Sequence, residues 1–541
     1  MKNLTVLLAF IIVCLPLSAR SQDSVLTINI EDNEYWWAGV ITVSDQMPFH
    51  GGPFEFDFLG SVAGNQGQPL LISNQGRYVW SEDPLKFEFK DRKLHVESRT
   101  GTLQHGSHGS TLREVYQYAS ERFFPFNGKI PAETLFLQPQ FNTWIEFTYD
   151  QNQKGILEYA HKIVDSGFSP GVLMIDEGWA RNYGDWDFDR VTFPEPKAMM
   201  DELHQLGFKV ILWVCPYISP DGPFWKDLWL DYVAKKDTMW IINADNPQFP
   251  AVMQWWNGFS NVVDLSNPKG KAWFNGKLHD LMDTYGVDGF KFDGGDAVHY
   301  SDKRFLSHTR SYQKDITPNQ HSELFVELGL DYPLNEYRVA WKMGGQPLAM
   351  RLRDKGHNWG DLKKLIPGII NQGLMGYAYS CPDMIGGGQY LSFIDMESID
   401  QELVVRSAQC HALMPMMQFS VAPWRILSEE NLKLCVEMGK LHTQMGPEVL
   451  TLAHNAAKSG EPIVRAMDYE FPGMGYDQLV DQFMLGNSVL VAPVLEKGAR
   501  SRVVYFPKGK WRGDDGSVVE GPAKTVIDVP LSRLAWYRKM E

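Results

Sequence analysis

Acidic residues follow several short apolar runs that have the length of buried strands. The run Val287 to Phe292 ends at Asp293, which a Gly-Gly pair follows. An acidic side chain at the carboxyl end of a barrel strand lies where catalysis is expected, although most Asp-Gly-Gly strings are simple turns. The other acidic candidates at plausible strand ends are Asp176, Glu177, Asp354 and Asp383.

Several carboxylates at one barrel mouth would suit either glycoside hydrolysis or a metal site. A retaining glycosidase needs one ionised carboxylate as nucleophile and one protonated carboxyl as proton donor, about 5 to 5.5 Å apart. A metal-dependent hydrolase needs closely spaced ligands, and the sequence contains no His-x-His or His-Glu-x-x-His motif. The pattern favours a sugar-cleaving site with no metal and no cofactor, and a metal-assisted hydrolase is the weaker alternative.

The segments that would carry these carboxylates alternate between strand-like and helix-like patterns from residue 131 to residue 441. We expect the first four strands at Leu135 to Trp144, Val172 to Asp176, Lys209 to Val214 and Val287 to Asp293. This alternation predicts an α/β fold, and at this length a closed (β/α)₈ TIM barrel. No Gly-x-Gly-x-x-Gly motif follows an early strand, so a dinucleotide-binding fold has no support.

Apolar and polar residues alternate with period two on both sides of the barrel region. Leu26 to Ile30 and Leu85 to Phe89 show this pattern before the barrel, and Ser488 to Val494 and Thr525 to Val529 show it afterwards. We therefore predict three domains: an N-terminal antiparallel β-sandwich over 22–130, the barrel over 131–441, and a C-terminal antiparallel β domain over 442–541.

Composition narrows the class of partner. The 541 residues exceed the needs of one ordinary domain, and aromatic residues make up 13%, including 18 Trp. Such a content suits stacking on flat ligands such as sugar rings, although core packing also uses aromatics. The net charge of −15 argues against nucleic acid or an anionic membrane as partner. A neutral glycoside or oligosaccharide fits better.

The first residues have the pattern of a secretory signal peptide. Lys2 precedes an apolar run from Leu4 to Leu17, and Ala19-Arg20-Ser21 has small residues where a signal peptidase would cut. We predict a signal peptide over 1–21, no membrane span, and export to the periplasm or the extracellular space. A lipoprotein signal at Cys14 is disfavoured. The other four cysteines are expected to be free buried thiols, with a single disulfide as the alternative.

Taken together, these segments resemble glycoside hydrolase family 31, and the likeness covers nearly all of the chain after residue 21. Single motifs are weak, but jointly they are specific. They are Ile175-Asp176-Glu177, Asp185 to Asp189, Phe193-Pro194-Glu195-Pro196, Lys291-Phe292-Asp293, Asp383 to Gly387, Asp481 to Gly486 and Val491 to Val494.

A closer likeness is to the branch of bacterial α-galactosidases and the myogenesis-regulating glycosidase. It is carried by Tyr337-Arg338-Val339, Gln346, Arg351 to Asp354, Gly376-Tyr377 and Pro382 to Gly387. The acid/base of α-glucosidases usually stands in a Trp-x-Gly-Asp-Asn string, whereas Asp354 lies between Arg353 and Lys355. The resemblance implies an α-galactosidase that acts on terminal sugars. Its alternatives are an α-glucosidase, α-xylosidase or sulfoquinovosidase, or an inactive carbohydrate-binding protein.

The resemblance also implies roles for single residues. Asp293 would be the nucleophile and Asp354 the acid and then the base. Asp176 and Glu177 would bind the hydroxyl groups of the sugar, and Lys291 would lie beside the nucleophile. Arg338, or else Arg351, would also contact the sugar, and Trp144 and Trp256 would form the walls of the pocket. Asp383 is a further implied contact. Alternative interpretations are a surface ion pair for Asp354, helix capping for Asp176 or Glu177, core packing for each Trp, and support of the Gly386 to Gly388 loop for Asp383.

A proton donor must carry a proton before the reaction begins. The pKa of Asp354 must therefore be raised by burial or by nearby negative charge. Positive charges close to its carboxyl would have the opposite effect, so we expect Arg353 and Lys355 to face away from the pocket.

Overall fold

The computed structural model describes residues 24–99, 101–222, 225–226, 228–230, 238–395 and 398–540. The predicted signal peptide, residues 1–21, lies outside these ranges. Within them, no helix combines the length and the apolar character that crossing a membrane would require.

Eight parallel strands form the predicted TIM barrel. Their order around the sheet is β21-β20-β18-β16-β11-β10-β9-β22, and a parallel bridge between Ile385 and Phe419 nearly closes it. The strands are β9 (Gln140–Asn142), β10 (Val172–Ile175), β11 (Lys209–Val214), β16 (Gly289–Phe292), β18 (Asn335–Tyr337), β20 (Met350–Arg351), β21 (Ser380–Cys381) and β22 (Gln418–Phe419).

The first barrel strand is shorter than the sequence pattern predicts. Leu135 lies in a helical turn, α2 (Thr134–Leu137), and β9 begins after Pro139. Trp144 starts another turn, α3 (Trp144–Phe147), where the Asn142 side chain accepts a hydrogen bond from its backbone N–H. The prediction of one strand over Leu135 to Trp144 is therefore wrong at both ends, because apolar periodicity over so few residues does not separate a helical turn from a strand.

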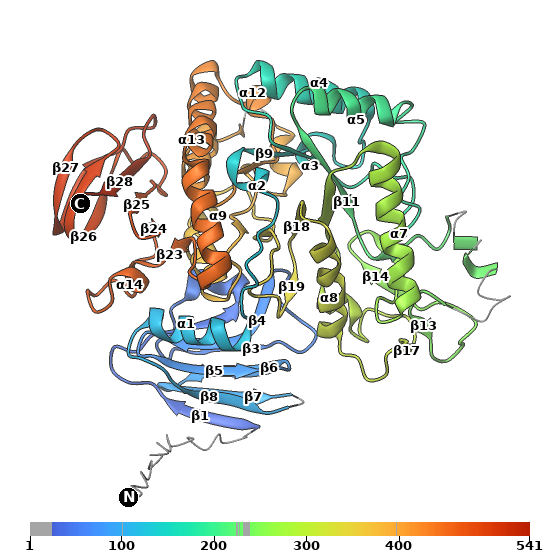
Figure 1. The fold of residues 1–541 in the computed structure, drawn as a ribbon, viewed down its shortest axis with the longest axis horizontal. Helices are drawn as coiled ribbons and strands as arrows, with labels where there is room; N and C mark the ends of the chain where they lie inside the picture. The colour runs from blue at the N-terminus through green and yellow to red at the C-terminus, as the bar shows by residue number, and fades with distance from the viewer. Residues whose placement is uncertain are drawn as a thin grey trace, which may run out of the picture.

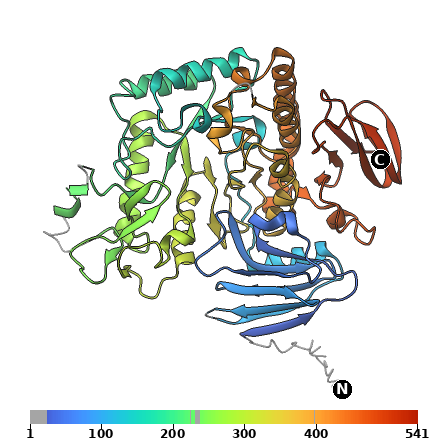
Figure 2. The ribbon, with the colours of Figure 1, turned by 180° about the vertical axis from the view of Figure 1, so that it is seen from behind.

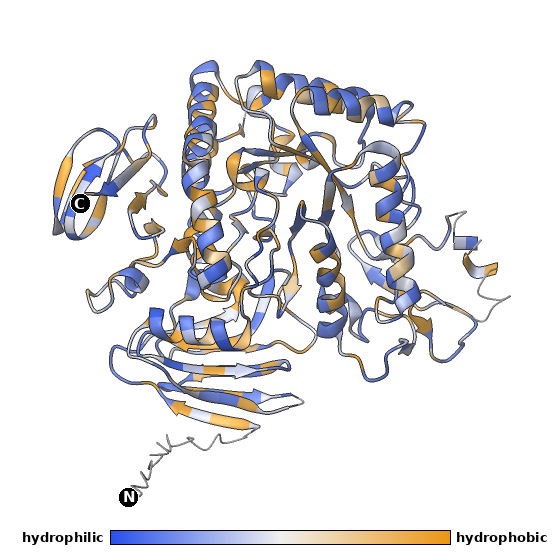
Figure 3. Cartoon of the chain, in the orientation of Figure 1, coloured by the Kyte–Doolittle hydropathy of each residue, from blue (hydrophilic) through white to orange (hydrophobic). Residues whose placement is uncertain are grey.

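Helices surround the barrel, and Figure 3 shows hydrophilic and hydrophobic residues mixed along them, as expected for helices with one face on the core. Several begin at a residue whose side chain caps the backbone, such as Asn152, Asn267, Thr317 and Ser428. The longer helices are α4 (Gln153–Asp165), α5 (Pro196–Gln205), α7 (Pro268–Tyr285), α8 (Pro318–Glu327), α10 (Leu365–Leu374), α11 (Gln401–Ala412) and α13 (Glu429–Ser459).

The N-terminal region forms two sheets that lie against the barrel (Figure 1). One has the order β1 (Val25–Asn29), β7 (Lys93–Ser98), β6 (Leu85–Lys90), β3 (Phe54–Asp57). The other has the order β19 (Ala340–Trp341), β4 (Gln66–Ser73), β5 (Arg77–Ser81), β8 (Leu103–Ser107), with β2 (Trp36–Val40) also on β4. Because β19 comes from the barrel segment, the two domains share a sheet. The prediction of β structure throughout this region is wrong for helix α1 (Leu112–Phe123), whose buried residues Leu112, Val115, Tyr116 and Ala119 are spaced as on one helix face after the cap Thr111.

The C-terminal region is a six-stranded sheet beside helix α13, and the view from behind shows the same neighbours (Figure 2). Its order is β23 (Val464–Arg465), β24 (Phe483–Leu485), β25 (Val489–Ala492), β28 (Ala535–Lys539), β26 (Ser501–Gly513), β27 (Val518–Asp528). The domain boundary predicted between residues 441 and 442 falls inside α13, which leads directly to this sheet.

A small sheet extends the barrel mouth. It consists of β12 (Tyr217–Ile218), β15 (Gly258–Val262) and β14 (Val252–Trp255), in that order. Trp256 and Asn257 form the turn between β14 and β15, so this hairpin brings both residues to the mouth.

Candidate active site

A cavity of about 630 Å³ opens at the carboxyl ends of the barrel strands. Eight of the nine site residues predicted from the sequence line it: Trp144, Asp176, Glu177, Trp256, Lys291, Asp293, Arg338 and Asp354. The ninth, Asp383, lies behind the cavity wall. The barrel thus gathers residues that are spread over more than two hundred positions of the chain.

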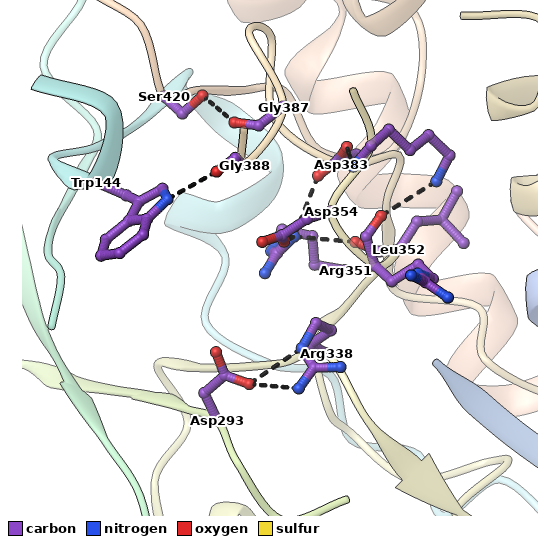
Figure 4. Close-up of polar contacts among 12 residues, drawn as sticks. Trp144, Asp293, Arg338, Arg351, Leu352, Asp354, Asp383, Gly387, Gly388 and Ser420 are labelled. Atoms are coloured by element: carbon purple, nitrogen blue, oxygen red, sulfur yellow. Dashed lines mark hydrogen bonds and ion pairs between the residues drawn. The ribbon is translucent and has the colours of Figure 1, made fainter. Parts of the chain in front are cut away.

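Asp293 follows strand β16 and is held by cationic and N–H donors. Arg338 donates from Nε and Nη2 to its Oδ1 at 3.0 and 2.9 Å (Figure 4). Trp213 Nε1 donates to its Oδ2 at 3.3 Å. Burial raises the pKa of Asp293, but the charges of Arg338 and Lys291 outweigh burial and leave the pKa below its usual value. Asp293 is therefore ionised at neutral pH, as a nucleophile must be.

Lys291 lies on the cavity side of β16, as strand alternation predicts from its distance of two residues to Asp293. Its ammonium group donates to Asp176 Oδ2 at 2.6 Å, and both side chains are almost fully buried. Thr143 Oγ accepts a hydrogen bond from the backbone N–H of Asp176 at 3.0 Å. This buried ion pair fixes Asp176 at the floor of the cavity.

Glu177 has partners that sequence reasoning missed. Tyr183 and Asn257 both donate to Glu177 Oε1, and Asn257 also donates to the Tyr183 hydroxyl at 2.9 Å. Burial, together with the charges of Asp176 and Asp293, raises the pKa of Glu177 to about 7 in spite of these hydrogen bonds. Glu177 is thus a carboxyl that changes its charge near neutral pH inside the cavity.

Asp354 follows strand β20 and pairs with a buried arginine. Arg351 Nη1 donates to Asp354 Oδ1 at 2.7 Å (Figure 4). The Asp354 side chain is 49% exposed. Partial desolvation inside the cavity raises the pKa of Asp354, but the charges of Arg351, Lys291 and Arg338 lower it well below its ordinary value. The expectation that Asp354 is protonated before substrate binds is wrong for the ligand-free protein, because Arg351 faces it.

The two basic neighbours of Asp354 differ in position. Arg353 lines the cavity, contrary to the expectation that it faces away, and donates to the Ala63 carbonyl at 3.3 Å. Lys355 is not among the residues that line this cavity, and its ammonium group donates to the Arg353 carbonyl at 3.2 Å. The rim of the cavity therefore carries one more positive charge than the sequence suggested.

Asp383 supports the backbone next to Asp354, the predicted acid. It accepts hydrogen bonds from Arg351 Nη1 at 3.1 Å and from the backbone N–H of Lys355 at 2.9 Å. Its backbone has φ of 105°, a conformation that side-chain residues rarely adopt. Burial raises its pKa to about 7. These contacts correspond to the loop-support interpretation rather than to direct contact with a sugar.

The two predicted aromatic walls differ in exposure. Trp144 Nε1 donates to the Gly388 carbonyl at 2.8 Å, which ties the end of β9 to the loop after β21. Trp256 is 47% exposed and lies with its ring centre 5.6 Å from the Arg338 guanidinium carbon, a cation–π contact. Both rings line the cavity, as predicted.

Residues from two further segments complete the cavity. The loop between β3 and β4 contributes Ser61, Ala63 and Gly64, and Gly64 O accepts a hydrogen bond from Arg338 at 2.8 Å. The segment after Asp293 contributes Asp296, which pairs with Arg338 at 2.7 Å, and His299. Neither segment carried a sequence signal beyond its glycines.

The described residues contain no group of three or more His, Cys, Asp or Glu side chains arranged to hold a metal ion. Cys215, Cys381, Cys410 and Cys435 are buried free thiols. Cys215 is fully buried and is not among the residues that line the cavity, so its role is packing.

Two models of one protein family match this chain. The model of the glycosyl hydrolases family 31 TIM-barrel domain matches residues 138–426, and the family's C-terminal domain model matches residues 460–539. The chain belongs to glycosyl hydrolase family 31. The resemblance found in its motifs is thereby confirmed.

Individual relatives cover a wide range of substrates. The myogenesis-regulating glycosidase of Mus musculus is 31% identical over 433 residues, which are 78% of this chain and 59% of the relative. The α-xylosidase XylQ of Lactiplantibacillus pentosus is 24% identical over 86% of this chain and 61% of its own length. The chain thus spans about six tenths of these relatives.

Solved structures show the same fold. A family 31 dextranase of Flavobacterium johnsoniae, complexed with glucose, superposes with a TM-score of 0.81 over 97% of this chain and 68% of its own, at 19% identity. An α-xylosidase from a soil metagenome, complexed with xylose, gives a TM-score of 0.80 at 19% identity and covers 97% and 82% of the two chains.

Proposed function

We propose that this protein is a retaining exo-α-glycosidase, and that its substrate carries a terminal α-galactose. One observation carries the proposal: two carboxylates from separate barrel strands, Asp293 and Asp354, line the same cavity. They are also close enough for the charge of Asp354 to raise the pKa of Asp293. Double displacement at an anomeric carbon needs two carboxyl groups on either side of the bond that breaks, and this pair is the candidate for them.

In the first step, Asp293 attacks the anomeric carbon while Asp354 gives its proton to the leaving oxygen. Arg351 favours the ionised form of Asp354, so the donor role requires that Asp354 takes up a proton as substrate displaces water and further desolvates its half-exposed carboxyl. Formation of the glycosyl ester neutralises Asp293. The negative charge of Asp293 raises the pKa of neighbouring acids such as Glu177, so these pKa values fall once the ester has formed. A low pKa of Asp354 at that stage suits its second role, the base that activates water.

The remaining polar groups would bind and orient the sugar. Asp176 and Glu177 offer charged acceptors to hydroxyl groups inside the cavity, and such hydrogen bonds are strong where water is excluded. Lys291 neutralises Asp176 and helps to keep Asp293 ionised. Trp144 and Trp256 would cover the apolar faces of the ring.

Specificity for galactose is supported by the motifs around Arg338 and Asp354 rather than by any single contact. Relatives that act on other sugars include an α-glucosidase, an α-xylosidase and a sulfoquinovosidase. A panel of 4-nitrophenyl α-glycosides tests the proposal: the α-galactoside should give the highest kcat/KM. A higher value for glucoside, xyloside or sulfoquinovoside would reassign the sugar. Equal turnover by wild type and Asp293→Asn would point to a protein without catalysis at this site.

We also propose that the protein is exported, on the basis of the signal-like pattern of residues 1–21. The test is expression with its own leader, followed by fractionation and N-terminal sequencing of the product. A mature chain that starts at Gln22 in the exported fraction is expected, whereas a chain that retains Lys2 inside the cell would contradict export.

A further inference from the structure

A buried ion pair lies inside the barrel, behind the wall of the candidate active site. Glu336 of β18 and Arg351 of β20 are 2% and 1% exposed, and neither lines the active-site cavity. Arg351 Nε donates to Glu336 Oε1 at 3.1 Å. Gln418 of β22 donates to the other oxygen, Glu336 Oε2, at 2.5 Å. Both oxygens of Glu336 are therefore held by protein donors.

Stability alone does not account for a charged pair at this place. The interior of a TIM barrel is normally packed with branched apolar side chains. Taking two charges out of water is costly, and apolar residues of similar volume often replace a buried ion pair with no loss of stability. In the register of the sheet, Glu336 is the neighbour of Lys291, which lines the cavity. The pair is thus next to the groups proposed to carry out the reaction.

Arg351 connects Glu336 to the predicted acid. Its Nη1 donates to Asp354 Oδ1 at 2.7 Å, and also to Asp383 Oδ1 at 3.1 Å. A guanidinium can give two parallel hydrogen bonds to one carboxylate, which is the strongest pairing it forms. Here Nε is engaged by Glu336 and Nη1 is shared between two acids. Asp354 consequently receives one hydrogen bond from Arg351 instead of two.

The cations that lower the pKa of Asp354 all have acidic partners besides Asp354 itself. These cations and their partners are Arg351 with Glu336 at 3.1 Å, Lys291 with Asp176 at 2.6 Å, and Arg338 with Asp296 at 2.7 Å. The other charged groups around Asp354 are Lys355, Asp293 and Asp383, which interact with its charge, and Arg353, which lines the same cavity. Glu336 is therefore the partner of the cation that donates to Asp354.

The donor role of Asp354 requires a proton, and Arg351 opposes its uptake. A second hydrogen bond from Arg351, or a guanidinium charge without a counter-charge, would stabilise the carboxylate further. Glu336 prevents the first by engaging Nε, and it reduces the second with its own negative charge.

We infer that Glu336 is a positioning residue of this site: it limits Arg351 to one hydrogen bond with Asp354 and offsets its charge, so that Asp354 can take up the proton that the leaving group needs. The inference rests on the proposed glycosidase function and deepens it. Glu336 does not line the cavity, so it acts through Arg351 and not on the substrate.

Three variants test the inference. Glu336→Gln removes the charge and keeps the size of the side chain. Glu34→Gln is the matched control, because Glu34 is 0% exposed and its Oε1 likewise accepts from an arginine Nε, that of Arg77 at 2.7 Å, but in the N-terminal region. The double variant Glu336→Gln/Arg351→Met removes the guanidinium as well, and so leaves no unpaired charge where the pair was.

The first readout is the pH dependence of kcat for the methyl glycoside of the sugar that wild type cleaves best. Methoxide is a poor leaving group that needs a proton, so the alkaline limb of kcat reports the acid in the bound state. Glu336→Gln should move this limb to lower pH by about one unit, which is a roughly tenfold loss on that limb. The double variant should move it above wild type, since the charge in direct contact with Asp354 outweighs the more distant one. Glu34→Gln should leave it in place.

The second readout is kcat/KM for the 2,4-dinitrophenyl glycoside of the same sugar. Its leaving group needs no proton, so Glu336→Gln should cleave it at a rate close to that of wild type. A residue with a merely structural role would lower the rates on both substrates together.

The outcomes separate the inference from the proposed function. An alkaline limb that Glu336→Gln leaves in place would overturn the inference, and so would equal losses on the methyl and dinitrophenyl glycosides or a wild type that cleaves only the latter. If Glu336→Gln does not fold, the double variant decides, and a limb no higher than that of wild type would overturn the inference. The glycosidase assignment would stand in all these cases. A wild type that cleaves neither glycoside would overturn both.

Discussion

At the scale of single residues, the site depends on how the same side-chain type is given different charge states. Asp293 and Glu177 are carboxyls in one cavity, yet Arg338 lowers the pKa of Asp293 whereas burial raises that of Glu177 to about 7. Separating the pKa values of neighbouring acids is how active sites divide the tasks of binding and catalysis.

Glu177 gives a prediction for stability. Below about pH 4.5 its carboxyl is protonated in both the folded and the unfolded protein and has no effect. Between about pH 4.5 and 7 the unfolded chain releases the proton first, so this group lowers the free energy of unfolding as pH rises. Replacing it by Gln removes this effect.

Glu177→Gln should therefore become more stable relative to wild type as the pH rises from 5 to 8, by on the order of 2 kcal/mol. Thermal unfolding of both proteins at several pH values measures this difference. The amide oxygen can still accept hydrogen bonds from Tyr183 and Asn257, so the packing is preserved. Parallel curves for the two proteins would show that Glu177 titrates as an ordinary carboxyl.

The carboxylates of the site can be predicted from the sequence, but their partners cannot. Asp293 and Lys291 could be predicted because their relation is local, two positions apart on one strand. Tyr183 and Asn257 reach Glu177 from a loop and from a distant hairpin, so no local pattern links them. The sequence offers Arg351 as an alternative sugar-binding residue. Its pairing with Asp354 could not be predicted, because that contact depends on the path of the chain after β20.

At the scale of elements, the loop after β21 connects the acid to the rest of the barrel mouth. Ser420 donates to the Gly387 carbonyl at 2.6 Å, and Trp144 donates to the Gly388 carbonyl at 2.8 Å. The backbone of Gly387 has φ of 69°, and a Cβ there would lie 2.1 Å from the carbonyl oxygen of Lys355. Any side chain at this position would move the segment that carries Asp354.

Gly387→Ala should accordingly lower kcat/KM by about 10- to 100-fold, since small displacements of a catalytic group have effects of this size. Gly473→Ala is a matched control, because Gly473 has a similar φ of 72° and open space around its Cβ position. Steady-state kinetics of both variants measure the difference. If the two variants lose the same activity, backbone strain alone and not displacement of the acid would be responsible.

The barrel could be predicted because its helices and the strands β10, β11 and β16 are long enough to show a pattern. The later strands β18, β20, β21 and β22 have two or three residues each, too few for any pattern. Helix α1 was missed because it interrupts a region of alternating strands. The shared sheet through β19 joins segments far apart in the chain, which periodicity cannot show.

At the scale of the whole molecule, buried polar contacts join the three parts. Arg406 on α11 is fully buried and donates to the carbonyls of Ala499, Val529, Pro530 and Arg533 in the C-terminal region, at 3.0 to 3.4 Å. Each of these carbonyls would lose a donor if the guanidinium were removed. This single side chain therefore contributes much of the attachment between the barrel and the C-terminal sheet.

Arg406→Met should lower the free energy of unfolding by about 2–4 kcal/mol and speed up proteolysis of the C-terminal region. Arg500→Met is the control, because Arg500 pairs with Glu402 at the same interface but is 48% exposed, and such surface pairs contribute about 0–1 kcal/mol. Thermal unfolding and limited proteolysis measure both effects. Equal changes in the two variants would refute a special role for Arg406.

The most direct test of the central claim is to trap the covalent intermediate. The protein is incubated with a galactose-configured inactivator that forms a stable glycosyl ester, digested, and mapped by mass spectrometry. We expect one label per chain, on Asp293, and no label in Asp293→Asn. A label on Glu177, Asp354 or any other residue would contradict the assignment of the nucleophile.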